Sequence, residues 1–255
     1  PGKEEFYETI RYFGKQIELT GVKLQLNKRV AAQDLLDAGF DEVILATGIA
    51  PRKLDLPGAD HPKVLSYLDV LRDKKPVGKT VAVIGAGGIG FDTSEFLTHQ
   101  GTSPSLDVNL FLKEWGIDGS MQNRGGLAAE GPHLPEVPRK VYLLQRKTSK
   151  VGDGLGKTTG WIHRTSLKNR NVEMVSGVSY EKIDDAGLHV TIGGKAQVLP
   201  VDNVVICAGQ EPLRELQAGL EAAGKKVHLI GGADVAAELD AKRAINQGSR
   251  LAAAI

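Results

Sequence analysis

The sequence predicts an α/β protein with a parallel sheet and a small antiparallel meander. A β-branched apolar run at 80–84 leads directly into a glycine-rich turn at 85–90 and then into a helix-compatible segment, which is the order of a parallel strand and its crossover helix. Two segments, 43–51 and 205–212, repeat one pattern of apolar strand, alanine, small residue, glycine and proline. Short runs that alternate apolar and polar residues between 180 and 199 predict the meander.

The composition is typical of a soluble globular protein with room for one large or two ordinary domains. Its 255 residues are 41% hydrophobic and 25% charged, and 32 basic against 31 acidic residues give a net charge of +1. This balance provides no general attraction to nucleic acid or to an anionic membrane, so we expect neither as a partner. The one cysteine, Cys207, excludes an internal disulfide and fits a reducing compartment. We find neither a leader sequence nor an apolar run long enough to span a membrane, so we expect a cytoplasmic protein.

The first third of the chain predicts helix, strand and linker in turn. Apolar residues spaced by four and three over 3–20 predict an amphipathic helix. Alternation over 22–26, with Val30 following, predicts a short strand pair, and the apolar run at 41–48 predicts a buried strand that ends in a small-residue turn. Prolines and a glycine then mark a linker at 51–62. A short helix is expected at 66–72.

The middle of the chain continues the strand and helix alternation around one long connection. Residues 91–100 carry the helical pattern that follows the glycine turn. Residues 101–138 are rich in Gly, Pro, Ser and Asn and predict an irregular stretch, which at this length is either functional or disordered. A buried strand at 141–145, a helix at 161–169 and a strand at 172–175 come next.

The last third predicts the meander, two buried strands and a terminal helix. The three alternating runs are 180–183, 188–192 and 197–199. The apolar runs at 204–209 and 227–230 predict the buried strands, and 239–255 predicts the helix.

The glycine-rich turn carries the most chemical information. Its spacing is G-x-G-x-x-G between a strand and a helix, and it consists of Gly85, Gly87, Gly88, Ile89 and Gly90 with Ala86. Glycines let the backbone approach a pyrophosphate, and the helix N-terminus supplies free N–H groups and positive dipole charge. An incidental glycine-rich loop is the alternative, but its place between strand and helix favours Rossmann-like FAD/NAD(P)-binding domains.

The end of the following strand predicts which dinucleotide binds. An acidic residue there reads a free ribose 2′-hydroxyl, whereas basic residues accommodate a 2′-phosphate. This strand ends in Arg146 and Lys147, with Lys150 close behind and no acid among them. The residues favour NADP(H), and the alternative is a solvated basic strand end.

A carboxylate follows the strand at 227–230. Asp234 comes after two glycines and before a helix, where it can accept hydrogen bonds from sugar or ribityl hydroxyls. The alternative is an aspartate that caps the helix.

The remaining residues suggest neither a metal site nor an acid–base set. Residues 152–158 imitate a phosphate-binding P-loop, but Val151 stands where the first glycine belongs and no buried strand leads into them. Cys207 lies in an apolar strand and reads as an inert core thiol. The six histidines lack metal-ligand spacing, so any chemistry is hydride transfer by cofactors, with no catalytic side chain predicted.

Several segments resemble the C-terminal part of the bacterial NADPH-dependent 2,4-dienoyl-CoA reductases, flavoenzymes related to trimethylamine dehydrogenase and to glutathione and thioredoxin reductases. The matching segments are 61–71, 85–92, 114–118, 155–164 and 204–212. The resemblance extends over essentially the whole chain and also accounts for the long stretch at 101–138.

The resemblance implies a larger enzyme, in which electrons pass from NADPH to FAD, through a 4Fe–4S cluster to FMN, and then to the dienoyl-CoA. The FMN and the cluster are expected only in a barrel upstream of Pro1, as a further part of the same polypeptide. Within this chain, 1–75 and 213–255 are expected to be two incomplete segments of the FAD-binding domain, and 76–212 the inserted NADPH-binding domain. Because the chain holds only half of the FAD site, we expect it not to reduce dienoyl-CoA alone.

The resemblance also assigns cofactor-binding residues. The NADPH contacts are Gly85, Gly87, Gly88, Ile89, Gly90, Arg146 and Lys147. Contacts to FAD are Thr47, Gly48 and Asp234, with Ala241, Lys242 and Arg243 near the flavin ring, and Gly209 and Gly232 complete the cofactor-binding set. A non-catalytic NADP(H)- or ADP-binding module, or a subunit of another flavin-dependent complex, stays open as the alternative.

Overall fold

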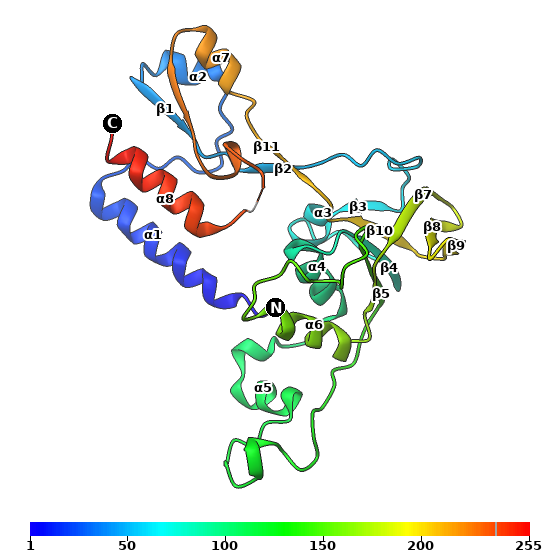
Figure 1. Ribbon diagram of the computed structural model, residues 1–255. Coiled ribbons are helices and arrows are strands. Elements are labelled where there is room, and N and C mark those ends of the chain that lie inside the picture. The colour runs from blue at the N-terminus through cyan, green and yellow to red at the C-terminus, as the bar shows by residue number, and fades with distance from the viewer. Residues whose placement is uncertain (238) are drawn as a thin grey trace. The chain divides into compact units, whose positions relative to one another are not determined.

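The computed structural model describes residues 1–237 and 239–255, and the chain divides into two compact units (Figure 1). Unit 1 consists of Pro1–Gln16 and Lys53–Ala208, and unit 2 of Ile17–Arg52 and Gly209–Ile255. The chain therefore leaves unit 1 after Gln16, re-enters it at 52/53 and leaves it again at 208/209. The sequence predicts domain boundaries at 75/76 and 212/213. Which cofactor each unit holds stays a prediction.

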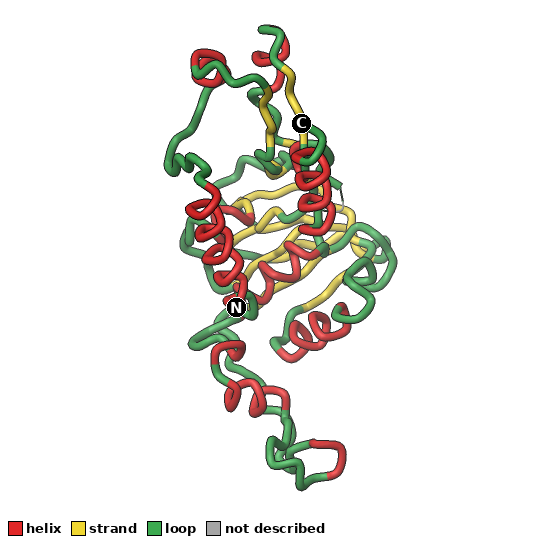
Figure 2. The backbone as a smooth tube through the Cα atoms, turned by 90° about the vertical axis from the view of Figure 1, so that its left-hand side faces the viewer, coloured by secondary structure: helices red, strands yellow, loops and turns green. Residues whose placement is uncertain are grey.

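A five-stranded parallel sheet forms the centre of unit 1. Its strand order is β3-β10-β4-β5-β6, with bounds β3 (Val64–Ser66), β10 (Asn203–Ile206), β4 (Thr80–Ile84), β5 (Lys140–Leu144) and β6 (Glu173–Val175). All neighbours run parallel, so the carboxyl ends of the strands meet at one edge. Figure 2 shows these strands lying alongside one another. The predicted α/β class with a parallel sheet is confirmed.

Each face of this sheet is covered by a different kind of element. α3 (Tyr67–Leu71), α4 (Gly88–Thr98) and α6 (Gly160–Asn169) pack on one face. Since alternate residues of a strand point to opposite faces, Val81 and Val83 of β4 join the core with the helices, while Ala82 and Ile84 face the meander.

The meander is antiparallel, as predicted, and consists of β7 (Val178–Asp184), β8 (Gly187–Ile192) and β9 (Lys195–Leu199). A β-bulge interrupts the pairing of β7 with β8 between Tyr180 and Lys182. The buried side chains of the meander and of the facing side of the sheet form a hydrophobic core separate from the one beneath the helices. This core includes Val178, Ile183, Leu188, Val190, Leu199, Ala82, Ile84, Leu144, Val204 and Ile206.

The stretch 101–138 is more ordered than predicted. It contains η2 (Pro104–Leu106), α5 (Val108–Trp115) and η3 (Arg124–Gly126). The Asp107 carboxylate caps α5 by accepting hydrogen bonds from the backbone N–H groups of Asn109 and Leu110 in its first turn. Gly116 ends the helix in the left-handed conformation. The expectation of an irregular stretch missed this helix because it is short and flanked by glycine and proline.

Unit 2 holds a small parallel pair of strands with one covered face. β1 (Glu42–Leu45) pairs with β12 (Lys226–Leu229), and α2 (Ala32–Asp37) and α7 (Gln217–Ala222) pack on it around Val43, Leu45 and Leu220. Unit 2 also contains β2 (Ile49–Pro51) and β11 (Gln210–Pro212), which pair in antiparallel fashion. Its other elements are η4 (Gly231–Ala233) and α8 (Ala241–Ala252).

The N-terminal helix forms where predicted, as η1 (Glu4–Phe6) followed by α1 (Tyr7–Thr20). The strand pair expected at 22–26 is wrong. Val22, Leu24 and Leu26 are exposed, and among the described residues this segment has no strand partner, so alternation alone did not produce a sheet. No helix in the described part of the chain is both long enough and apolar enough to cross a membrane.

Candidate nucleotide-binding site

A cavity of ≈ 480 Å³ lies at the carboxyl edge of the unit 1 sheet. This edge is where ligands bind in open α/β sheets. The residues that line it follow β4, β5 and β10 or come from β7 and the loop at 149–155: Ile84, Gly85, Ala86, Gly87, Gly88, Gln145, Arg146, Lys147, Ser149, Asp153, Gly154, Leu155, Tyr180 and Ala208. The structure thus brings the glycine turn and the basic strand end together around one space.

Two glycines of the turn are required by the fold. Gly85 adopts φ +108°, and a Cβ there would lie 2.9 Å from the backbone of Cys207 and Ala208. A Cβ at Gly90 would lie 1.8 Å from the Gly85 carbonyl oxygen. Gly90 is not among the residues that line the cavity, so its function is to let α4 approach the end of β4.

The other two glycines leave room for a ligand. A Cβ built on Gly87 or Gly88 meets no atom within 4 Å, and both residues line the cavity. Ile89 does not line it. The turn therefore has the open backbone that a pyrophosphate needs, and the residues present fit a dinucleotide.

The N-terminus of α4 adds attraction for an anion. The helix begins at Gly88, its N-cap Gly87 has no side chain to satisfy the first N–H groups, and its first turn carries no acidic residue. Free N–H groups and the positive end of the helix dipole therefore point toward the cavity side of the turn.

Two cations lie beside the turn, and neither is paired with a carboxylate of the described residues. Arg146 and Lys147 line the cavity and are exposed, and neither forms an ion pair with any described carboxylate. The Gln145 side-chain amide donates to the backbone oxygens of Lys147 and Ser149 at 3.0 and 2.8 Å. These bonds hold the loop in place, so the basic groups are positioned before a ligand arrives.

Sequence reasoning missed nine of the fourteen residues that line this cavity, and two of the nine have ionisable side chains. Tyr180 reaches it from β7, and Asp153 reaches it from the loop after β5. Burial raises the pKa of the Tyr180 phenol, although the nearby Arg146 acts in the opposite direction. A single sequence gives no signal that a meander strand returns to the glycine turn.

The loop that imitates a P-loop has a packing role instead. Gly152 adopts φ +79° and its Cβ position lies 2.6 Å from the Phe91 ring. Arg164 of α6 donates from Nη1 to the Gly152 carbonyl oxygen at 2.9 Å. The loop leads from β5 into α6 and does not wrap a phosphate with consecutive N–H groups in the way that a P-loop does.

Cys207 lies directly after β10 beside the glycine turn, but it is not a reactive thiol. Burial raises its pKa to about 12, and its Sγ donates a weak hydrogen bond to Thr93 Oγ1 at 3.5 Å. Among the described residues, no group of three or more His, Cys, Asp or Glu side chains is placed to hold a metal ion.

Unit 2 brings together some of the predicted flavin contacts. The carboxyl ends of β1 and β12 are adjacent, so the turn with Thr47 and Gly48 lies beside the turn with Gly232. A Cβ at Gly232 would lie 3.1 Å from the Gly48 carbonyl carbon, which explains the glycine. Gly209 adopts φ +83° next to Arg52 and lies outside the cavity of unit 1, which Ala208 lines in its place.

Asp234 is held in a small hydrogen-bond network. Gln247 donates from Nε2 to the Asp234 carboxylate at 2.7 Å and accepts from Gly231 N at 2.8 Å. Arg214 donates to the carbonyl oxygens of Ala233 and Asp234. The N-cap of α8 is Asp240, whose carboxylate accepts from Arg243 N, so Asp234 does not cap this helix.

The first turn of α8 contains the three residues that the resemblance places near a flavin ring, Ala241, Lys242 and Arg243. The Arg243 guanidinium donates from Nη2 to the carbonyl oxygens of Val235 and Ala237 at 2.7 and 3.1 Å. It therefore ties the segment after η4 to α8, while Lys242 is exposed.

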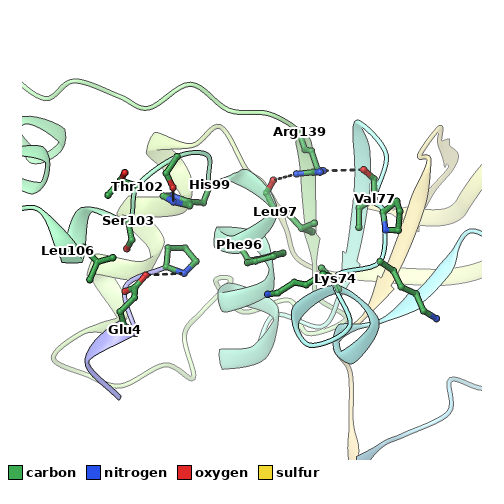
Figure 3. Close-up of a pocket in the computed structure, with 15 residues that line it drawn as sticks. Glu4, Lys74, Val77, Phe96, Leu97, His99, Thr102, Ser103, Leu106 and Arg139 are labelled. Carbon is green, nitrogen blue, oxygen red and sulfur yellow. Dashed lines mark hydrogen bonds and ion pairs between the residues drawn. The ribbon is translucent and has the colours of Figure 1, made fainter. Parts of the chain in front are cut away.

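A larger cavity, of ≈ 680 Å³, lies near the amino ends of β4 and β5 (Figure 3). Its charged groups are already engaged. Arg139 donates to the carbonyl oxygens of Gly78 and Leu97 at 3.1 and 3.2 Å, and Lys75 pairs with Asp69 at 2.6 Å. The Ser105 hydroxyl lowers the pKa of the Glu4 carboxyl to about 2, which adds a negative charge. This cavity is a poorer phosphate site than the smaller one.

The chain matches the pyridine nucleotide-disulphide oxidoreductase family over residues 6–242. Relatives include a cinnamate reductase of Clostridium sporogenes, 37% identical over 91% of this chain and 29% of that protein. A metal reductase of Desulforamulus reducens is 24% identical over 91% of this chain and 34% of that protein.

Solved structures agree on the fold. A 2-naphthoyl-CoA reductase in complex with 2-naphthoyl-CoA superposes with a TM-score of 0.74 and 22% identity, over 96% of this chain and 31% of that chain. The chain thus spans about a third of the length of the proteins it matches. With its glycine turn, its sheet and this match over most of its length, the chain belongs to the pyridine nucleotide-disulphide oxidoreductase family of flavin-dependent enzymes, which bind FAD and NAD(P).

Proposed function

We propose that this chain is the NADPH-binding portion of a flavin-dependent oxidoreductase that passes hydride from NADPH to FAD. The observation that carries the proposal is one cavity that combines the open backbone of Gly87 and Gly88 with two unpaired cations, Arg146 and Lys147. When bound, the nicotinamide supplies the hydride. The chain's own residues bind the nucleotide and orient it.

The binding groups divide the dinucleotide between them. Gly85, Gly87, Gly88 and the N-terminus of α4 hold the pyrophosphate through backbone N–H groups, with Ile89 and Gly90 forming the first turn behind them. Arg146 and Lys147 neutralise the ribose 2′-phosphate. Asp153 is the one carboxylate among the cavity-lining residues, and it forms no ion pair with Arg146 or Lys147 in the described part of the chain.

Unit 2 supplies one part of the flavin site in this proposal. Thr47, Gly48 and Gly232 form the close turn, and Asp234 offers a carboxylate that Gln247 already orients. Ala241, Lys242, Arg243 and Gly209 complete the set of proposed cofactor contacts. The remaining contacts, including the flavin's own glycine fingerprint, come from upstream domains of the same polypeptide.

The proposed substrate of the whole enzyme is a 2,4-dienoyl-CoA, reduced in the β-oxidation of unsaturated fatty acids in the cytoplasm. In this scheme FMN and a 4Fe–4S cluster belong to the upstream part. Support comes from two relatives whose names are cinnamate reductase and 2-naphthoyl-CoA reductase, because cinnamate and 2-naphthoyl-CoA are conjugated unsaturated carbonyl compounds, as a dienoyl-CoA is.

Calorimetric titration of the chain with NADPH and with NADH tests the binding proposal. We expect tighter binding of NADPH, and loss of most of that preference in the double variant Arg146→Ala/Lys147→Ala. Each charged contact is worth about tenfold in affinity. Lys150→Ala is the matched control, since Lys150 is an exposed cation of the same loop that does not line the cavity. Equal affinities for the two nucleotides in the unmodified chain would contradict the assignment.

A second candidate function is a nucleotide-binding module without redox chemistry. Every residue that lines the nucleotide cavity belongs to unit 1, so the nucleotide can bind without the residues proposed for the flavin, and this favours the module. Absorbance separates the two: a yellow protein whose flavin band bleaches on addition of NADPH supports hydride transfer. If the chain coupled to its upstream domains binds NADPH and FAD without bleaching, the module is the better description.

A further inference from the structure

Tyr180 lines the nucleotide cavity from a different part of the fold than the glycine turn. It lies on β7 in the meander, not on the parallel sheet, and yet it lines the same cavity as Gly85, Gly87 and Arg146. Its ring packs against the core between the sheet and the meander. The phenol is therefore carried by a rigid element.

The backbone around Tyr180 is built to place that side chain. Two residues before it, Val178 N donates to the Gln145 carbonyl oxygen at 3.0 Å, and Gly177 N donates to the Lys147 carbonyl oxygen at 2.9 Å. The start of β7 is thus bonded to the very loop that carries Arg146 and Lys147. Directly after Tyr180, the β-bulge breaks the register with β8, and bulges of this kind re-aim side chains beside functional sites.

The Tyr180 hydroxyl is ready to donate. No described residue forms a hydrogen bond with it. The hydroxyl oxygen is not one of the fully buried polar atoms that lack a partner, so a ligand in the cavity can reach it. Burial also raises its pKa, so the phenol is neutral throughout the physiological range and does not repel a phosphate. Arg146 is its charged neighbour.

We propose that Tyr180 determines nucleotide specificity by donating a hydrogen bond from its hydroxyl to the ribose 2′-phosphate beside Arg146. The inference rests on the proposed NADPH-binding function and adds to it a third recognition group from a separate element. NADH has no phosphate at this position to accept the hydrogen bond, so Tyr180 adds affinity for NADPH and not for NADH.

The test is calorimetric titration of Tyr180→Phe with NADPH, NADH and adenosine 2′,5′-bisphosphate. The variant keeps the ring and its packing and removes only the hydroxyl. We expect affinity for NADPH and for the bisphosphate to fall about tenfold, the worth of a hydrogen bond to a charged group, while affinity for NADH is unchanged. Tyr142→Phe is the control, because Tyr142 lies in the same unit on β5 and does not line the cavity.

Several outcomes overturn the inference. If Tyr180→Phe retains full preference for NADPH, or loses NADPH and NADH equally, the hydroxyl does not read the 2′-phosphate, and the proposed function survives. If the unmodified chain binds NADPH no more tightly than NADH, the assignment of the cavity and the role of Tyr180 both fail.

Discussion

Gly87 and Gly90 belong to one turn, yet they are glycines for different reasons. The Gly90 Cα faces the Gly85 carbonyl oxygen, where a Cβ would lie 1.8 Å away. That obstacle is backbone and cannot rotate aside. Gly87 faces open space, so its lack of a side chain benefits only a ligand. A substitution at Gly90 should therefore change the stability of the fold, and a substitution at Gly87 should change ligand binding.

Substitution by alanine makes this difference measurable. Gly90→Ala is expected to lower the free energy of unfolding of unit 1 by about 3 kcal/mol, the upper end for overpacking. Gly87→Ala is expected to cost less than ~1 kcal/mol and to weaken NADPH binding at least tenfold. Urea unfolding followed by tryptophan fluorescence reports on unit 1, because Trp115 and Trp161 both lie in it. A stable Gly90→Ala protein would contradict the packing argument.

At the same scale, the sequence predicted five of the fourteen residues that line the cavity. Gly85, Gly87, Gly88, Arg146 and Lys147 were found because local chemistry distinguishes them: a glycine spacing after a strand, and bases at a strand end. Tyr180 reaches the cavity only through tertiary folding, and a tyrosine in an alternating run looks like any strand residue. Asp153 is close to Lys147 in the sequence, but an aspartate in a glycine-rich loop looks like any exposed turn residue.

Among the elements, α3 shows how a short helix depends on one carboxylate. Asp69 accepts from the backbone N–H of Ser66 at 2.7 Å while the Ser66 hydroxyl accepts from Asp69 N at 3.1 Å, which forms a capping box. Lys75 and Ser66 lower the pKa of the Asp69 carboxyl to about 2. Its charge therefore stabilises the fold above the unfolded pKa of ~4.

This depressed pKa predicts a pH dependence. At pH 7, Asp69→Asn is expected to unfold about 1.5 kcal/mol more easily than the unmodified chain. As the pH falls from about 4 toward 2, Asp69 of the unmodified chain becomes protonated and the difference shrinks. Urea unfolding at several pH values measures it, with Asp60→Asn as control, since Asp60 is exposed. A difference that is constant with pH would exclude the charge as its cause.

The stretch 101–138 is anchored by a buried ion pair. Arg170, at the end of α6, is 2% exposed and donates from Nη2 to Glu114 Oε1 of α5 at 2.9 Å. Arg170 also donates to the Thr98 carbonyl oxygen at the end of α4. One arginine thus links α4, α5 and α6.

Removal of the Glu114 carboxylate leaves the buried positive charge of Arg170 unpaired. Glu114→Ala is expected to destabilise unit 1 by about 3 kcal/mol and to make 101–138 more sensitive to limited proteolysis. Lys113→Ala, on the same helix at an exposed position, is the matched control. If both variants were cleaved at the same rate, the ion pair would not be what holds α5.

The sequence predicted elements well where a segment has a strong apolar pattern of its own. β4, α4 and the meander formed as expected for this reason, although β4 pairs with β5 and β10, which lie far from it in the sequence. Val22, Leu24 and Leu26 have the alternation of a strand but no described partner strand, so they form no strand and are exposed. α5 was missed because its Asp107 cap and its anchor on Arg170 depend on residues outside its apolar pattern.

At the scale of the whole molecule, the division into two units predicts a local response to nucleotide. At NADPH concentrations 100 times the Kd, unit 1 is expected to gain ≈ 2.7 kcal/mol of stability. Hydrogen exchange should slow at residues 85–90 and 145–150, and it should stay unchanged in β1 and β12 of unit 2. Equal protection of both units on addition of NADPH alone would contradict placing the whole binding site in unit 1.

The pairing of β1 with β12 has a consequence for synthesis on the ribosome. Lys226 and Glu42 form an ion pair across this sheet although 184 residues separate them. At typical translation rates, β1 leaves the ribosome roughly 10–40 s before its partner strand exists. During that time Val43 and Leu45 have no sheet to join. A nascent chain arrested before residue 226 is therefore expected to be cleaved by protease near β1, even when the sheet of unit 1 is already protected.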